Sequence, residues 1–157
     1  MLKKIVSGGQ TGVDRSALDV AIELNWPYGG WCPRNRRAED GTIDPIKYAN
    51  LKETSASRYS QRTEMNVEDS DGTLIISADG ASMGSGTKLT IALAAKHHKP
   101  LFIVNLNEKI DEGQVIEWLN TNKIETLNVA GPREQTSPGI YKQAETFLRS
   151  LLQRIKS

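Results

Sequence analysis

The chain is poor in residues that cross-link a fold or bind a metal. Cys32 is the single cysteine among 157 residues, so a disulfide within the chain and a thiolate metal cluster are both impossible. One free thiol suits a reducing compartment. His97 and His98 are adjacent, and neighbouring side chains on a helix point about 100° apart. We therefore expect no metal site, and Cys32 is expected to serve packing.

Long apolar runs and a strong charge of one sign are also missing. No apolar segment approaches the roughly 20 residues that cross a bilayer, and Lys3–Val6 runs into a strand-like segment without a secretory cleavage site. The formal net charge of +1 gives no bulk attraction to nucleic acid or to an anionic membrane. We expect a cytoplasmic protein with no membrane partner, and nucleic acid is not the expected partner.

The residues that are present have the composition of one globular domain spanning 1–157, with 38% hydrophobic and 25% charged residues. Short apolar runs predict buried strands at 4–7, 73–77, 101–105 and 126–129, with a weaker candidate at 28–31. Helical patterns lie at 13–25, 57–69, 87–98, from about 111, and at 140–155. This alternation predicts an α/β three-layer sandwich with a mostly parallel sheet. The stretch after the weaker strand is polar and loop-rich.

A strand end, three glycines and a helix start come together at residues 5–15. Glycine lets the backbone approach a ligand closely, and the first turn of a helix has unpartnered amides at the positive end of the dipole. Such a turn suits an anion. One helix end contributes only about 0.3–1 kcal/mol, so side chains must help. The candidate binding residues are Ser7, Gly8, Gly9, Gln10, Thr11, Gly12, Asp14 and Arg15.

This first glycine turn fits neither familiar phosphate loop. It lacks the lysine of a Walker A loop and the G-x-G-x-x-G spacing of dinucleotide-binding folds. A tight turn that binds nothing is the alternative. Asp14 has two open roles, a favourable interaction with the helix dipole or a hydrogen bond to the ligand. A valine at Gly9 is expected to block the ligand's path and to weaken binding far more than folding.

A second glycine-rich turn follows the expected strand at 73–77. Gly84 and Gly86 would again admit an anion, Thr87 is expected to cap the next helix, and Lys88 adds positive charge. A flexible loop with an ordinary cap is the alternative. Ligands of α/β proteins bind at the carboxyl ends of the strands. Two such turns therefore favour a phosphate-bearing small molecule as the ligand of this protein.

Arginines supply further positive charge. Three stand in the polar stretch: Arg34, Arg36 and Arg37. A guanidinium binds phosphate in a fixed fork, and we favour Arg36 or Arg37 as ligand-facing over a solvated charge run. The expected helix 57–69 carries a polar face with residues four apart: Arg58, Arg62 and Asn66. That face could point at the site or at water, and Arg62 is its candidate site residue.

Seven motifs spread over nearly the whole chain resemble one known family. They are 7–15 (SGGQTGVDR), 30–33 (GWCP), 38–41 (AEDG), 62–74 (RTxxNVxxSDGTL), 86–90 (GTxLT), 128–134 (NVAGPRE) and 138–141 (PGIY). The chain resembles the putative molybdenum carrier family, a circularly permuted YpsA-like branch of the SLOG superfamily. The resemblance implies a Rossmann-like SLOG fold, a phosphate- or nucleotide-binding cleft, and binding of molybdenum cofactor (molybdopterin), a pterin with a phosphate and a dithiolene-held metal. Similar proteins form oligomers, so a homo-oligomer is expected.

The wider superfamily includes phosphoribohydrolases, whose motif resembles P-G-G-x-G-T-x-x-E with a catalytic glutamate. Here Thr90 stands in place of the glutamate, and a hydroxyl cannot act as a carboxylate base near neutral pH. The leading hypothesis is a carrier or sensor of a phosphate-bearing small molecule, either molybdenum cofactor or a nucleotide derivative. The alternative is a nucleotide N-glycosidase that uses an acidic residue: Asp14, Glu39, Asp40 or Asp71. A nucleic-acid-binding module rests on the arginine loop alone.

Overall fold

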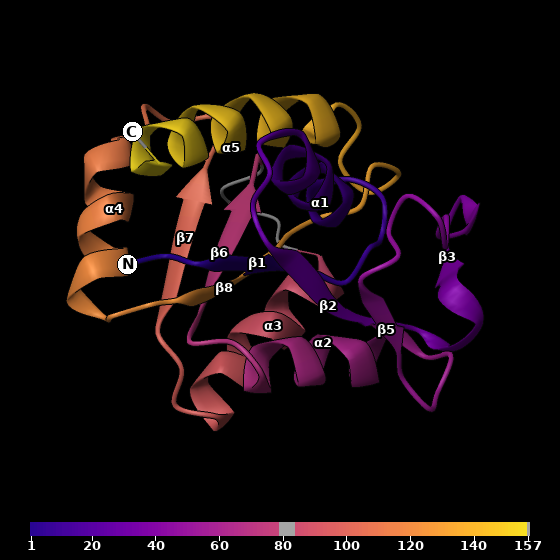
Figure 1. Ribbon diagram of the computed structural model, residues 1–157. Helices are drawn as coiled ribbons and strands as arrows, with labels where there is room; N and C mark the ends of the chain where they lie inside the picture. Colours follow the sequence, from indigo (N-terminus) through magenta and orange to yellow (C-terminus); the bar gives the residue numbers. More distant parts are fainter. Residues whose placement is uncertain (79–83, 157) are drawn as a thin grey trace.

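The computed structural model describes residues 1–78 and 84–156. Its main feature is a six-stranded sheet in which all neighbouring strands are parallel (Figure 1). Across the sheet the order is β5 (Leu51–Glu53), β2 (Tyr28–Cys32), β1 (Lys4–Val6), β8 (Thr126–Ala130), β6 (Gly72–Ser77) and β7 (Leu101–Asn105). The expected α/β fold is thus confirmed, and the weaker strand candidate is real. The short edge strand β5 was not predicted.

Helices cover both faces of the sheet (Figure 1). On one face lie α1 (Val13–Glu23), α4 (Glu112–Thr121) and α5 (Ile140–Lys156), whose apolar side chains build the larger core with the strands. On the other face lie α2 (Tyr59–Glu68) and α3 (Ser85–Lys96), which pack together in a smaller cluster. This three-layer arrangement is Rossmann-like, as expected.

The apolar stripe of α5 explains how the carboxyl-terminal helix holds its place. Its buried residues recur at helical spacing: Ile140, Ala144, Phe147, Leu148, Leu151 and Leu152. Burying a large apolar side chain stabilises a fold by about 1.5–3 kcal/mol. At the rim of this contact, Arg149 Nε donates to Glu23 Oε2 of α1 at 2.6 Å. The stripe therefore fixes α1, which follows the first glycine turn.

The start of α3 differs from the prediction. The helix begins at Ser85, and Gly84 is its N-cap residue, with no side-chain cap. The expected capping by Thr87 is therefore wrong, because this residue lies inside the first turn and is buried. A glycine cap leaves the amides of the first turn to other partners.

Residues 32–53 build a second, smaller core instead of a plain loop. Its buried side chains are Leu18, Cys32, Ala38, Ile43, Tyr48 and Leu51. The backbone around it forms a single 3-10 turn, η1 (Arg34–Arg36), and a two-stranded ribbon of β3 (Arg37–Ala38) and β4 (Gly41–Thr42). Burial raises the pKa of the Cys32 thiol, so this cysteine remains a protonated packing residue, as expected.

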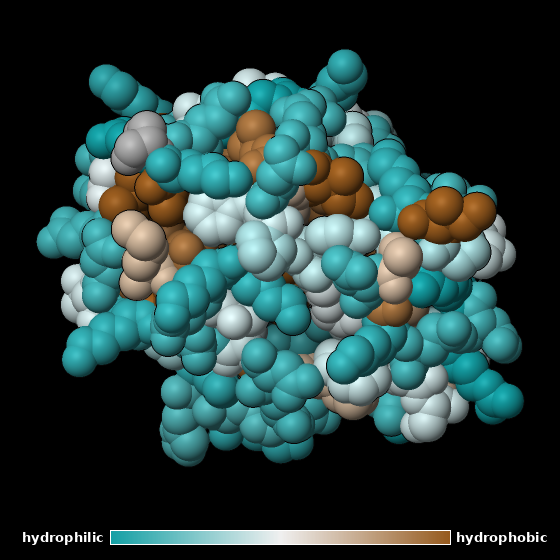
Figure 2. Space-filling model, in the orientation of Figure 1, coloured by the Kyte–Doolittle hydropathy of each residue, from teal (hydrophilic) through white to brown (hydrophobic). Residues whose placement is uncertain are grey.

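In the part of the chain that the structure describes, every helix is too short or too polar to cross a membrane. On the face drawn in Figure 2, hydrophobic residues lie in separate groups among hydrophilic ones. Among the described residues, three large hydrophobic side chains are exposed: Met1, Ile46 and Ile103.

Candidate functional site

A cleft opens at the carboxyl ends of three neighbouring strands, β1, β8 and β6. It encloses about 350 Å³, which lies within the size range of small-molecule sites. Its walls come from the turn after β1, from α2, from the start of α3 and from the segment after β8. Six of the expected site residues line it: Gly8, Asp14, Arg62, Gly84, Gly86 and Thr87. The two glycine turns therefore meet in one cleft.

A buried ion pair forms the floor of this cleft. Arg62 Nη1 donates to Asp14 Oδ2 at 2.8 Å, and the two side chains are 14% and 4% exposed. Gly8 makes this possible, since a side chain there would overlap the guanidinium. Burial raises the pKa of the Asp14 carboxyl above its ordinary value, whereas the Arg62 charge and the Gln10 amide act in the opposite direction. Arg62 Nε is buried without an acceptor among the described residues.

The start of α1 is closed by the chain itself. The Val13 amide donates to the Pro132 carbonyl at 3.2 Å, and the Gln10 amide donates to Asp14 Oδ2 at 3.4 Å. Gly12 has a φ of +79°, and a side chain on it would overlap the Pro132 carbonyl. The glycine therefore serves the close approach of the segment after β8. Amides that are already used by protein acceptors cannot also bind an anion.

Other residues of the first turn hold neighbouring segments. Ser7 Oγ donates to the Val129 carbonyl at 2.7 Å, and Gln10 Nε2 donates to the Arg37 carbonyl at 2.8 Å. Thr11 and Arg15 line a separate, more open hollow of about 800 Å³ on the other side of the turn. There Thr11 Oγ1 donates to Glu39, and Arg15 Nη1 donates to Asp40 Oδ2 at 2.6 Å.

Gly9 faces the smaller core and not the cleft. Its φ is +81°, and a Cβ there would lie 3.0 Å from the terminal methyl groups of both Ile43 and Leu51. This placement contradicts the expectation that a side chain at Gly9 would block the path of a ligand. The residue is a glycine because of backbone conformation and packing.

The start of α3, in contrast, opens into the cleft. Gly84, Ser85, Gly86 and Thr87 all line it. The amides of the first helical turn have no intrahelical acceptor, and a Cβ built on Gly86 meets no atom of the described residues within 4 Å. Residues 79–83 of this turn lie outside the described residues. Lys88 is exposed and does not line the cleft.

Two arginines of the polar stretch have structural contacts. Arg36 donates from Nη1 to the Tyr48 carbonyl at 3.3 Å and from Nη2 to the Leu51 carbonyl at 3.2 Å, which fixes the start of β5. Neither Arg36 nor Arg37 lines the cleft. The guanidinium of Arg37 lies 4.9 Å from the centre of the Tyr59 ring, which is itself part of the cleft wall.

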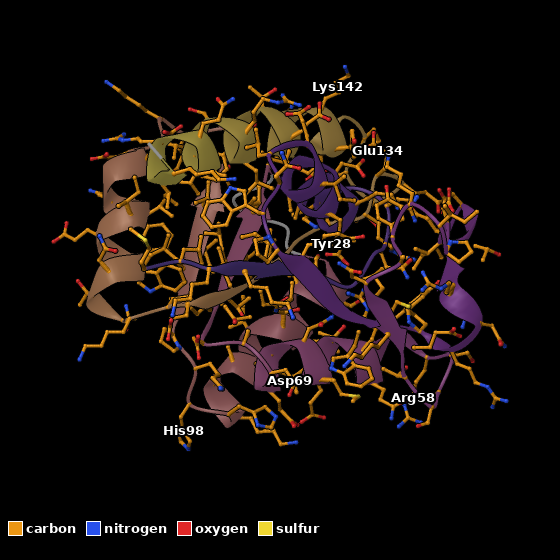
Figure 3. The ribbon with its side chains drawn as sticks, viewed as in Figure 1. Tyr28, Arg58, Asp69, His98, Glu134 and Lys142 are labelled. Atoms are coloured by element: carbon orange, nitrogen blue, oxygen red, sulfur yellow. The ribbon has the colours of Figure 1, made fainter. Side chains whose placement is uncertain are left out.

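The polar face of α2 points partly inward. Arg62 and Asn66 line the cleft, and Asn66 also holds β2 through both atoms of its amide: Nδ2 donates to the Trp31 carbonyl at 2.9 Å, and Oδ1 accepts from the Trp31 amide at 2.8 Å. Arg58 points away from the sheet at the other end of α2 (Figure 3). Trp31 does not line the cleft; its indole Nε1 donates to Asp69 Oδ2 at 2.7 Å.

Sequence reasoning did not select Arg133 as a site residue, although it lies in the motif after β8. Arg133 lines the cleft with a side chain that is 42% exposed. Its guanidinium lies 5.7 Å from the centre of the Tyr59 ring, within the range of a cation–π contact. Two polar residues deeper in the cleft, Asn128 and Thr63, were also missed. The sequence did place Asn128 in an expected strand and Thr63 in an expected helix, and this was the available signal.

The parallel sheet, its covering helices and the cleft at the strand ends define a Rossmann-like α/β protein. The model of the circularly permutated YpsA SLOG family matches residues 5–152, so the chain belongs to that family. It is also similar to a crystal structure of a putative molybdenum carrier protein from Syntrophus aciditrophicus SB. The two chains are 44% identical, the TM-score is 0.89, and the match covers 96% of this chain and 95% of that one. No curated protein matches the chain.

Proposed function

We propose that the protein is a carrier or sensor that binds a phosphate-bearing small molecule in the cleft. The observation that carries this proposal is the first turn of α3, which lines the cleft and in which Gly86 has open space beside it among the described residues. The N-terminus of a helix binds an anion readily when the anion can reach its backbone amides. Because the first amide of α1, that of Val13, already donates to the Pro132 carbonyl, we assign the phosphate to α3.

The charges around the cleft suit an anionic ligand. Arg62 and Arg133 contribute two guanidinium groups to the cleft wall, and Asp14 contributes its one carboxylate. Arg133 Nε also lies 3.7 Å from Glu39 Oε2, which is outside the cleft wall. Arg62 Nε also has no acceptor among the described residues, and buried donors are rarely left unpaired. A ligand oxygen that reaches this nitrogen would complete its hydrogen bonding.

The name of the relative from S. aciditrophicus makes molybdenum cofactor the first ligand to test, and a nucleotide derivative the second. The cleft fits the organic part of such a cofactor: α3 suits the phosphate, and Asn128, Thr63 and the Tyr59 ring offer polar and stacking contacts to a heterocycle. Cys32 is buried away from the cleft. The protein therefore supplies no thiolate, and the metal would stay on the dithiolene of the cofactor.

Native mass spectrometry of gently purified protein, followed by titration with molybdopterin and with nucleoside monophosphates, tests the proposal. We expect at least one of these ligands to bind. The Arg133→Gln variant should weaken binding about 10-fold or more, since a hydrogen bond to a charged group contributes about 1.5–3 kcal/mol. Arg58→Gln is the matched control, because Arg58 lies on α2 outside the cleft. Absence of binding by all these ligands would overturn the proposal.

A second candidate, the nucleotide N-glycosidase, is favoured by one observation. Of the four acidic candidates only Asp14 lines the cleft, and its carboxylate, which is paired with Arg62, would act there as the general base toward water. Thr90 cannot replace the missing glutamate, because its hydroxyl donates to the Gly86 carbonyl at 3.0 Å. Incubation with nucleoside monophosphates should then release free base by addition of water across the glycosidic bond. No release at high protein concentration would reject this activity.

A further inference from the structure

Outside the cleft, three side chains from two helices converge on the outer surface. Glu64 and Glu68 stand one helical turn apart on α2, and His97 is the C-cap residue of α3. The helices carrying them are held together by a small apolar cluster of Val67, Leu93 and Ala94. Their relative position therefore does not depend on the charged groups.

We propose that Glu64, Glu68 and His97 bind a divalent transition-metal ion of the Zn²⁺ class, which ties α2 to α3. His97 Nε2 lies 2.7 Å from Glu64 Oε2 and 3.4 Å from Glu68 Oε1. One ligand atom from each of the three residues lies within 4.8 Å of the other two. Ligand atoms about 2.0–2.2 Å from a tetrahedral Zn²⁺ stand about 3.3 Å apart, so small side-chain rotations complete the site.

The chemistry of the three ligands selects the kind of ion. One imidazole with two carboxylates suits Zn²⁺ and its neighbours in the first transition series. Ca²⁺ and Mg²⁺ prefer six or more oxygen ligands and do not favour imidazole. Two glutamates four residues apart on one helix face also repel each other, and a bound dication relieves that repulsion. The fourth position of the metal would hold water.

Lys96 is the internal competitor of this ion. Its Nζ lies 2.8 Å from Glu64 Oε2, the same atom that contacts His97. The Lys96 side chain is 62% exposed, so it can swing into solvent when a metal binds. Without metal, the cluster is an ion-paired contact between the two helices. Removing the lysine should therefore raise the affinity for Zn²⁺, which a purely structural role for the cluster would not produce.

The site is independent of the proposed ligand cleft. Residues of α2 and α3 that line the cleft come from the start of α3 and the inner face of α2, whereas the cluster involves the end of α3. The adjacent histidines by themselves did not predict a metal site, and His98 is not part of the cluster. Figure 3 shows His98 at the outer end of α3. The two glutamates that complete the site come from a different helix.

Zn²⁺ titration at neutral pH tests the proposal, with calorimetry for affinity and NMR of the histidine rings for location. The chain holds two histidines, so each ring can be assigned by substitution. We expect Zn²⁺ to shift the His97 ring signals, and His97→Gln and Glu68→Gln to weaken binding about 10-fold or more. His98→Gln is the matched control and should bind as the unaltered protein does. Lys96→Gln should bind more tightly.

Several outcomes would overturn the site. These are the absence of Zn²⁺ binding up to millimolar concentration, equal affinity in His97→Gln, or a shift of the His98 ring in place of the His97 ring. Circular dichroism of each variant separates a lost ligand from a lost fold. A thermal scan supplies a second readout, because Zn²⁺ should raise the unfolding temperature of the unaltered protein and not that of His97→Gln.

Discussion

Arg62 of α2 donates a hydrogen bond of 2.8 Å to Asp14 at the start of α1, and so connects helices on opposite faces of the sheet. Both side chains are largely buried. Gly8 has no side chain at the point where the guanidinium passes. The pair is therefore both the floor of the cleft and a tie between the two helical layers.

Removing one partner of this pair should destabilise the protein strongly. We expect Arg62→Gln to lower the free energy of unfolding by about 3–5 kcal/mol at neutral pH, since it leaves a buried carboxylate uncompensated. Urea unfolding of Arg62→Gln and of the double variant Asp14→Asn/Arg62→Gln provides the measurement. The double variant should recover part of the loss, and a single variant as stable as the unaltered protein would contradict the prediction.

A second prediction concerns alkaline pH. Tyr48 and Tyr141 both donate to Asp19, and burial followed by this hydrogen bond raises the pKa of each phenol above its ordinary value. A raised folded-state pKa contributes stability that is present below about pH 10, the ordinary phenol value, and is lost as pH rises through the folded value. Ultraviolet titration of the phenols should show delayed ionisation, and Asp19→Asn should advance it. An unchanged curve in the variant would refute this assignment.

Two glycine substitutions should separate a fold position from a ligand position. Gly9→Ala puts a Cβ into the smaller core at a positive φ and should cost about 1–2 kcal/mol. Gly86→Ala meets open space in the first turn of α3 and should be neutral, or stabilise by about 0.4–1 kcal/mol. Thermal unfolding of both variants checks the contrast. Equal stability of the two would argue against the described packing around Gly9.

Charge at the start of α3 tests where the anion binds. Gly86→Asp places a carboxylate beside the first amides, and we expect it to weaken binding of a phosphate-bearing ligand about 10-fold or more through like-charge repulsion. Gly86→Ala is the steric control and should retain affinity. If Gly86→Ala lowered the affinity as much as Gly86→Asp does, the space at this position, and not its charge, would control ligand binding.

The sequence predicted those parts of the fold that follow from local patterns. The buried strands β6 and β8 were found from short apolar runs, and α5 from its apolar stripe. The edge strand β5 was missed because Leu51–Glu53 is short and only its leucine is buried. Its pairing with β2 is set by tertiary contacts that no local pattern records.

The candidate site shows the same limit. Arg62 could be placed on a polar helix face, but only the fold shows that it meets Asp14 through the gap left by Gly8. Arg36 had the charge expected of a phosphate-binding residue, yet it donates to backbone carbonyls at the start of β5. An arginine motif alone cannot distinguish these two uses, because both employ the same donors.

The position of β8 has a consequence for how the chain is assembled. This strand pairs with β1 on one side and with β6 on the other, although it is the last strand in chain order among the described residues. During synthesis, the two earlier halves of the sheet have no partner at their facing edges until residues 126–130 leave the ribosome. Cooperative closure of the sheet, and with it the cleft beside Pro132, must therefore await the residues of β8.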